Sequence, residues 1–187
     1  MSVAADAAAY PKGARVSARI GSNVGCPTYR SERIDSHHRI DTFRSGSWVM
    51  NRWLSCSARR LDEQGAARTF VWTGGEEGTK VLAYFTLAPH RVTSMSGSEY
   101  SIPAVLLARL ALDLSIQGRG LGSQLLVDAL ERASYALGRS ARGVIVVDAV
   151  NREAAGFYEH FGFRQVAGNP FRLYRSASDV ARSLGVA

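Results

Sequence analysis

Apolar residues recur at three- and four-residue spacings over two long stretches of the chain. This spacing predicts one amphipathic helix over 47–64 and a second that runs from the glycines of 118–122 to about Leu137. A glycine follows each stretch, as is common after a helix C-terminus. Asn151 is a favoured N-cap residue, so a third, shorter helix is predicted from there to Gly162.

The other apolar runs are short and rich in β-branched and aromatic residues, which favours strands. A glycine-rich turn joins the first two runs into a β-hairpin, and Pro89 and residues 93–101 predict a loop after it. The run over 104–112 is interrupted by Arg109 and reads as a central strand. The predicted strands cover residues 68–73, 80–87, 104–112, 143–150, 163–167 and 171–174.

This order of elements predicts an α+β fold around a mixed sheet. With 187 residues the chain is long enough for one domain with its own core. We expect a flexible tail over 1–28, a folded domain over 29–176, and a tail or short helix over 177–187. The composition, 46% apolar and 21% charged, excludes collagen-like, coiled-coil and wholly disordered chains. No apolar run is long enough to predict a membrane span.

The chain carries 23 basic against 16 acidic residues, a net charge of +7. All the basic residues except Lys12 and Lys80 are arginines, whose planar donors suit phosphate. This balance favours a polyanionic partner, namely nucleic acid, a phosphorylated cofactor or an acidic protein. The alternative is a basic surface that only aids solubility.

Cys26 and Cys56 form no CxxC motif, and no histidine stands at zinc-ligand spacing, so no metal site is predicted. Two reduced thiols and the lack of a secretory signal pattern at the start favour the cytoplasm. His37 and His38 lie in a polar segment and are expected at the surface.

The segment Gln117-Gly118-Arg119-Gly120-Leu121-Gly122 stands between a predicted strand and a predicted helix. Glycines there let backbone N–H groups approach a ligand, and a helix N-terminus adds a positive dipole, so the segment suits a pyrophosphate. A nucleotide P-loop is excluded because no lysine follows the last glycine. A dinucleotide fold would need a glycine where Ser123 stands. A dinucleotide site and a plain turn without a ligand remain as alternatives.

These residues resemble the GNAT N-acetyltransferases, whose acetyl-CoA loop follows the pattern Q/R-x-x-G-x-G/A. A second motif of that family matches Asn151-x-x-Ala154-x-x-Phe157-Tyr158-x-x-x-Gly162-Phe163. The resemblance implies a mixed central sheet flanked by helices, with acetyl-CoA where two central strands splay apart. The residues it implies for acetyl-CoA are Leu110, Ala111, Leu112, Gln117, Gly118, Arg119, Gly120, Leu121, Gly122, Ser123, Asn151 and Phe157.

A narrower resemblance is to the GNAT toxins of type II toxin–antitoxin pairs, although the long N-terminal tail departs from it. The resemblance implies acetylation of the α-amine of aminoacyl-tRNA, a block of translation and a homodimer. It also implies an antitoxin of the ribbon-helix-helix type, through which alone the complex reaches DNA. Candidate tRNA contacts are Arg59, Arg60, Arg68 and Arg109. As alternatives, Arg59 and Arg60 suit the dipole at the end of their helix, Arg68 is an ordinary surface residue, and Arg109 is a packed strand residue.

By the resemblance, Tyr158 is the acid that protonates the departing CoA thiolate. Spacing alone favours a core aromatic of an amphipathic helix, and only the family match favours catalysis. A strand N–H near Leu112 is placed to stabilise the tetrahedral oxyanion. Two other functions stay open: acetylation of a small amine or protein N-terminus, and acetyl-CoA binding without catalysis.

Overall fold

The computed structural model describes residues 29–75, 77–93, 101–138 and 143–185. The tail expected over 1–28 lies outside them. Seven strands form one sheet in the order β1-β2-β3-β4-β5-β7-β6. All neighbouring strands are antiparallel except β4 and β5, so the predicted mixed sheet is confirmed. The strands are β1 Glu32–Arg33, β2 Arg68–Gly74, β3 Lys80–Thr93, β4 Ser101–Leu112, β5 Val144–Asp148, β6 Arg164–Val166 and β7 Asn169–Ser176.

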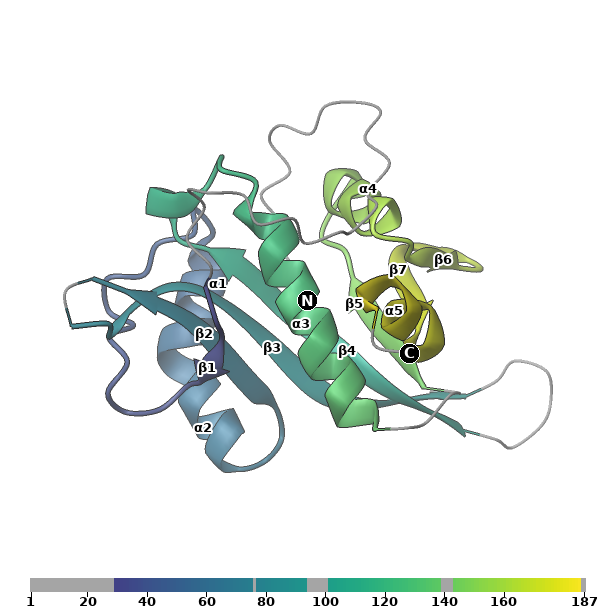
Figure 1. Cartoon of the computed structure of the whole chain (residues 1–187), viewed down its shortest axis with the longest axis horizontal. Coiled ribbons are helices and arrows are strands. Elements are labelled where there is room, and N and C mark those ends of the chain that lie inside the picture. The colour runs from purple at the N-terminus through teal and green to yellow at the C-terminus, as the bar shows by residue number, and fades with distance from the viewer. Residues whose placement is uncertain (1–28, 76, 94–100, 139–142, 186–187) are drawn as a thin grey trace.

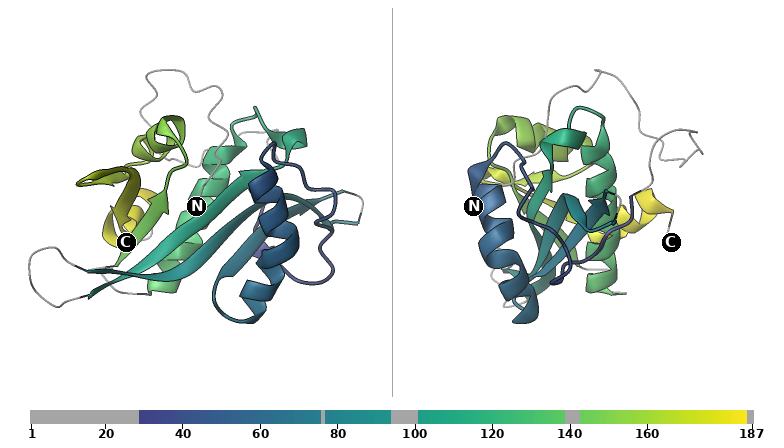
Figure 2. Two further views of the ribbon diagram at one scale, coloured as in Figure 1. Left: turned by 180° about the vertical axis from the view of Figure 1, so that it is seen from behind. Right: turned by 90° about the vertical axis from the view of Figure 1, so that its left-hand side faces the viewer.

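The helices lie on both faces of this sheet. Helix α3 crosses one face, and α1 and α2 cover the other (Figures 1 and 2). Each face has its own core because side chains alternate along the strands. Trp72 and Phe85 pack with α3, whereas Val71 and Tyr84 pack with α1. The helices are α1 Trp48–Trp53, α2 Arg59–Glu63, α3 Leu121–Leu137, α4 Arg152–His160 and α5 Ala177–Leu184.

The helix predicted over 47–64 is present but irregular. A π-helical turn, η1 (Leu54–Ala58), separates α1 from α2, and the helix ends before Gly65, whose φ is +73°. The spacing also placed Trp48 on the apolar face, which is wrong, because its side chain is 70% exposed. Turns of this kind change which side chains share a face, and apolar spacing alone does not reveal them.

The loop predicted around Pro89 is also wrong. Strand β3 continues through Pro89 to Thr93, and β4 begins at Ser101, so the two strands form a longer ribbon than expected. Strand β2 pairs with β3 only as far as Leu87, so Pro89 lies on an edge, where its missing N–H is tolerated. The short strand β1 was not predicted. Within the described ranges, no helix is both long and apolar enough to cross a membrane.

Candidate active site

The two central strands separate halfway along β4. Their parallel pairing runs from Ala104 opposite Val144 to Leu107 opposite Val147 and ends there. Strand β4 continues to Leu112, while the chain after β5 turns toward α4. In Figure 1 the two strands lie together at the lower right and diverge toward the top. The second half of β4 therefore pairs with β3 on one side, and among the described residues its other edge has no strand partner. We call this unpaired edge of β4 the opening.

A β-bulge at this point changes which way the side chains of β4 face. The register between β3 and β4 shifts by one residue, which leaves Ala108 as an extra residue. Leu107 and Leu110 both pack in the core beside α3 although they are three residues apart. Plain alternation from Leu107 would have turned Arg109 toward α3 as well. The bulge instead turns Arg109 toward α1.

The backbone of β4 beyond the bulge offers hydrogen-bonding groups to the opening. The N–H of Asp113 donates to the carbonyl oxygen of Leu82 in β3 at 2.7 Å. Backbone groups alternate in an antiparallel pair, so Leu112 and Leu110 turn their N–H groups away from β3. The side chain of Ala111 packs in the core beside α1. Of the three residues expected to line the donor site, Leu110 and Leu112 can therefore bind through their backbone.

The glycine segment forms a turn at the N-terminus of α3. Gly118 and Gly120 have φ values of +73° and +72°, and a Cβ added at either would meet open space. This left-handed conformation favours glycine, and the segment leads directly into the first turn of α3, where the backbone N–H groups and the helix dipole suit an anion. The side chain of Leu121 is buried in the core, so only its backbone can serve a ligand. The turn fits the predicted anion site.

Arg119 and Gln117 have different roles in this segment. Arg119 is exposed, and its Nη2 donates to the carbonyl oxygen of Ser115 at 3.1 Å. The side-chain amide of Gln117 donates to the carbonyl oxygens of Ser45 and Leu112, at 3.1 and 2.9 Å. Gln117 therefore ties the loop to the end of β4 and to the segment before α1. Its amide positions the site and is not aimed at a ligand.

Asp113 makes a second tie at the same place, which the sequence did not single out. Its carboxylate accepts hydrogen bonds from Arg44 N at 2.8 Å and from Ser115 N and Oγ at 3.0 and 2.6 Å. Burial raises the pKa of Asp113, but these hydrogen bonds outweigh it and hold the pKa below its usual value. An aspartate directly before a Leu-Ser pair is a signal for such a turn.

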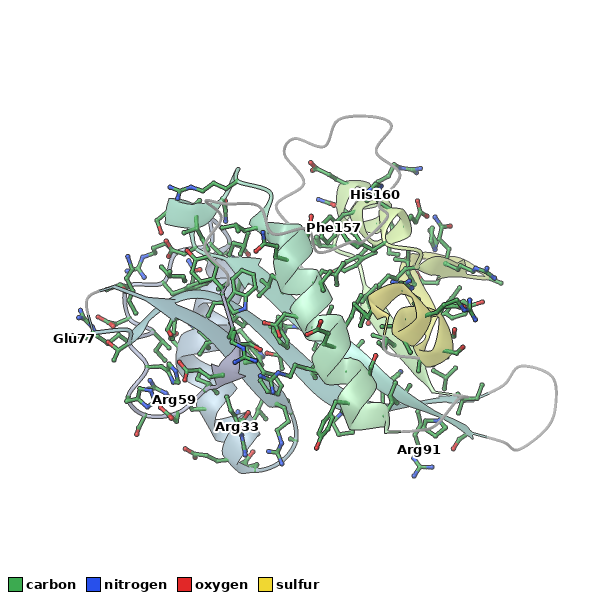
Figure 3. The ribbon with its side chains drawn as sticks, in the orientation of Figure 1. Arg33, Arg59, Glu77, Arg91, Phe157 and His160 are labelled. Carbon is green, nitrogen blue, oxygen red and sulfur yellow. The ribbon has the colours of Figure 1, made fainter. Side chains whose placement is uncertain are left out.

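Helix α4 brings the second motif to the same core. Asn151 caps the helix by accepting a hydrogen bond from Ala154 N at 2.8 Å, as predicted. Phe157 and Tyr158 are both buried, their rings in edge contact 5.3 Å apart; Phe157 is labelled in Figure 3. Within the described chain the Tyr158 hydroxyl is fully buried and has no hydrogen-bond partner. Burial raises its pKa, so the hydroxyl keeps its proton.

Three of the four candidate tRNA contacts lie at or beside α2, and the fourth, Arg109, lies in β4. Arg60 and Arg68 are exposed, and Arg68 donates to the carbonyl oxygen of Asp62 at 2.8 Å. Arg59 is half-buried and donates to the carbonyl oxygens of Asp35 and His38, which anchors the loop before α1. Figure 3 shows Arg59 on the α2 side of the molecule, away from Phe157.

Arg109 is buried, with only 4% of its surface exposed. Its guanidinium lies 5.3 Å from the centre of the Trp53 ring, and Nη1 donates to the carbonyl oxygen of Ala108 at 2.6 Å. Its Nε has no hydrogen-bond partner in the described chain, and burial lowers its pKa. In this arrangement Trp53 packs against the cation, and a tRNA phosphate could reach it only if Trp53 moved.

The expectation that His38 lies at the surface is wrong. His37 is exposed, but the His38 ring is buried against it, 4.1 Å between ring centres. Glu32, His37 and His38 bring potential metal ligands within 4.8 Å of one another. However, Nδ1 of His38 accepts a hydrogen bond from Asp35 N at 3.0 Å, so its proton stays on Nε2, 3.2 Å from Glu32. A protonated nitrogen is not a metal ligand, so this group does not suit a metal ion.

Known proteins share both the sequence pattern and the fold of this chain. Residues 67–165 match the family model described as the acetyltransferase (GNAT) domain. A protein of Mycobacterium tuberculosis named tRNA-acetylating toxin is 32% identical over 160 residues, which cover 82% of this chain and 95% of the relative.

Solved structures of the toxin AtaT share the fold. One, a tyrosine-to-phenylalanine mutant bound to the C-terminus of the antitoxin AtaR, aligns with a TM-score of 0.73 and 25% identity, over 82% of this chain and 96% of that one. Another, AtaTR bound with acetyl-CoA, aligns with a TM-score of 0.71 and 26% identity, over 83% of this chain and 98% of that one.

Proposed function

The chain belongs to the GNAT family of acetyl-CoA-dependent N-acetyltransferases, and we propose that it is a toxin that acetylates the α-amine of aminoacyl-tRNA and so blocks translation. The predicted family and fold are confirmed. The substrate is supported by the mycobacterial relative named tRNA-acetylating toxin and by the basic charge of the chain. The small-amine and protein N-terminus alternatives are tested below.

The observation that carries the proposal is the opening between β4 and β5. There Leu110 and Leu112 turn backbone groups away from β3, and the N-terminus of α3 follows the end of β4. The Tyr158 hydroxyl, which has no hydrogen-bond partner among the described residues, belongs to the same core as these strand residues. A buried hydroxyl without a partner costs free energy, so a group supplied by a ligand is the expected partner. Acetyl-CoA has the matching features: a pyrophosphate for the turn, amides for the strand and a sulfur for the hydroxyl.

Different residues bind different parts of acetyl-CoA. The N–H groups of 118–123 hold the pyrophosphate, and Arg119, whose other contact is a backbone carbonyl, adds a charge-assisted donor. The backbone of Leu110 and Leu112 pairs with the pantetheine amides. Asn151 and Phe157 complete the channel from α4.

The chemistry is direct transfer of the acetyl group. The neutral α-amine attacks the thioester carbonyl carbon, a C–N bond forms, and the C–S bond breaks to release CoA. The oxyanion of the tetrahedral intermediate accepts a hydrogen bond from the strand N–H of Leu112. Tyr158 donates its hydroxyl proton to the departing sulfur, which leaves as the CoA thiol. The attacking nitrogen releases one proton as it becomes an amide, and that proton, carried by solvent, restores the Tyr158 hydroxyl. A free α-amine has a pKa near 8, so an appreciable fraction is already neutral at pH 7.

The RNA contacts, the protein partners and the compartment follow from the same proposal. Arg59, Arg60 and Arg68 contribute to phosphate contact, and Arg109 would join them only after Trp53 moves. The active form is a homodimer held in check by a ribbon-helix-helix antitoxin, through which alone it reaches DNA. Because aminoacyl-tRNA is made and used in the cytoplasm, the enzyme acts there.

The test is transfer of labelled acetyl from acetyl-CoA to charged tRNA, with uncharged tRNA and a panel of free amines and peptides as parallel acceptors. We expect label only on the charged tRNA, bound to the amino acid. Label on free amines or peptides but not on charged tRNA would reject the substrate while keeping the enzyme class.

A further inference from the structure

Three apolar side chains are exposed where α1 begins. Trp48 is 70% exposed, Val49 39% and Leu114 56%. Trp48 and Val49 open α1, and Leu114 opens the 3₁₀ turn η2 (Leu114–Ile116) that follows β4. We call these three residues the α1 rim. An exposed tryptophan beside other apolar groups marks an interaction surface more often than an isolated residue does.

The α1 rim is joined to the predicted active site. Leu114 N donates to the carbonyl oxygen of Arg44 at 2.7 Å, and a Cβ added to Gly46 would lie 3.6 Å from Leu114 Cδ2. The amide of Gln117 bonds the carbonyl oxygen of Ser45. The start of α1, the end of β4 and the glycine turn are therefore one connected unit, and α1 lies on the sheet face opposite α3 (Figure 2).

The charge around the α1 rim is positive. Arg44, Arg52 and Arg119 are exposed, and in the part of the chain that the structure describes none of their guanidinium groups lies within 4.0 Å of a carboxylate. Arg52 follows Trp48 by four residues, so the two share one side of α1. The rim thus combines an aromatic surface with uncompensated cations.

We propose that the α1 rim binds the unpaired 3′ end of the acceptor RNA, with a base stacked on Trp48 and phosphates beside Arg52 and Arg119. This inference rests on the proposed function. The amine to be acetylated is carried on the last nucleotide, so the unpaired nucleotides before it must cross a surface next to the active site. Unstacked bases bind exposed aromatic rings, and arginines bind the phosphates between them.

The test compares Trp48→Ala with Trp48→Phe and with Tyr135→Ala, an aromatic control that is 89% exposed on α3. Binding of fluorescently labelled, uncharged tRNA is measured first, because it does not depend on catalysis. We expect Trp48→Ala to raise the Kd for tRNA roughly tenfold, Trp48→Phe to restore most of the binding, and Tyr135→Ala to have no effect. The KM for charged tRNA should rise with the Kd, while kcat and the Kd for acetyl-CoA stay unchanged.

A second variant tests the charge of the rim. Arg52→Gln should lower the salt dependence of tRNA binding by about one unit of log–log slope. An unchanged Kd for tRNA in Trp48→Ala would overturn the inference. So would a matching loss of acetyl-CoA affinity, which would assign Trp48 to the donor adenine, or a shift in oligomeric mass, which would make the rim a self-contact. If tRNA binds through Trp48 but the wild-type enzyme transfers no acetyl group to charged tRNA, the proposed function fails, whereas the assignment of the α1 rim as an RNA-binding surface is retained.

Discussion

Removing the Tyr158 hydroxyl should move stability and activity in opposite directions. The ring is fully buried, and its Oη has no hydrogen-bond partner among the described residues. Burying an unpaired hydroxyl costs about 1–3 kcal/mol by mutational measures. The substitution Tyr158→Phe keeps the ring contacts with Phe157 and Phe163 and removes only that cost. We therefore expect the free energy of unfolding to stay equal or rise by about 1 kcal/mol, a gain of roughly 2–4 °C in Tm.

The same substitution should reduce kcat by about 10²–10⁴-fold, the usual worth of a positioned proton donor, with the Kd for acetyl-CoA little changed. Thermal unfolding of the free enzyme, titration with acetyl-CoA and single-turnover acetyl transfer measure the three quantities. Phe157→Leu serves as a packing control, which should lower stability. A fall in Tm for Tyr158→Phe would mean that the hydroxyl has a structural partner. Unchanged turnover would remove Tyr158 from the chemistry.

Three further predictions concern the surroundings of the site. Asp113→Asn should raise the KM for acetyl-CoA and lower stability by about 1–3 kcal/mol, because an amide cannot accept from both Arg44 and Ser115. The pKa of Asp113 is depressed in the folded state, so the stability that its carboxylate adds is fully present above the unfolded pKa, near 3.9. This stability is lost as the pH falls through the folded pKa. Denaturation curves of wild type and Asp113→Asn should therefore converge below about pH 4. Arg109→Met should leave stability unchanged or raise it by up to about 2 kcal/mol, since it replaces a buried cation without a carboxylate partner, and urea unfolding checks this; a large loss would show that the cation–π contact outweighs desolvation. Gly120→Ala should raise the KM for acetyl-CoA, with a backbone cost of about 1 kcal/mol from its positive φ, while equal KM values would mean that the turn does not hold the donor.

Much of this arrangement could be predicted from local patterns. The cap at Asn151, the hairpin, the central strand and the glycine turn each rest on a short stretch whose residues determine its conformation. These structural predictions succeeded because the information lies within a few neighbouring positions. The family motifs single out Tyr158 as the proton donor, which periodicity alone could not do, and that role stays a prediction.

The features that were missed depend on contacts between distant segments. The face that Arg109 takes follows from a one-residue bulge that reverses the alternation of β4, and the burial of His38 follows from its packing beside Glu32 and His37. Exposure of Trp48 reflects how the start of α1 meets the turn after β4. A single arginine within an otherwise apolar strand was the visible signal for the first of these, and it did not indicate which face the side chain would take.

The two ties made by Gln117 and Asp113 have a consequence for how each substrate changes the affinity of the enzyme for the other. One end of each tie is the turn that holds the donor, and the other is the entrance to the helix that we assign to the acceptor. Any shift that the donor induces in the turn is passed to that entrance. By linkage, the factor by which acetyl-CoA changes the affinity for RNA must equal the factor by which RNA changes the affinity for acetyl-CoA. The enzyme should therefore bind its substrates cooperatively, and cutting either tie should make the two affinities independent.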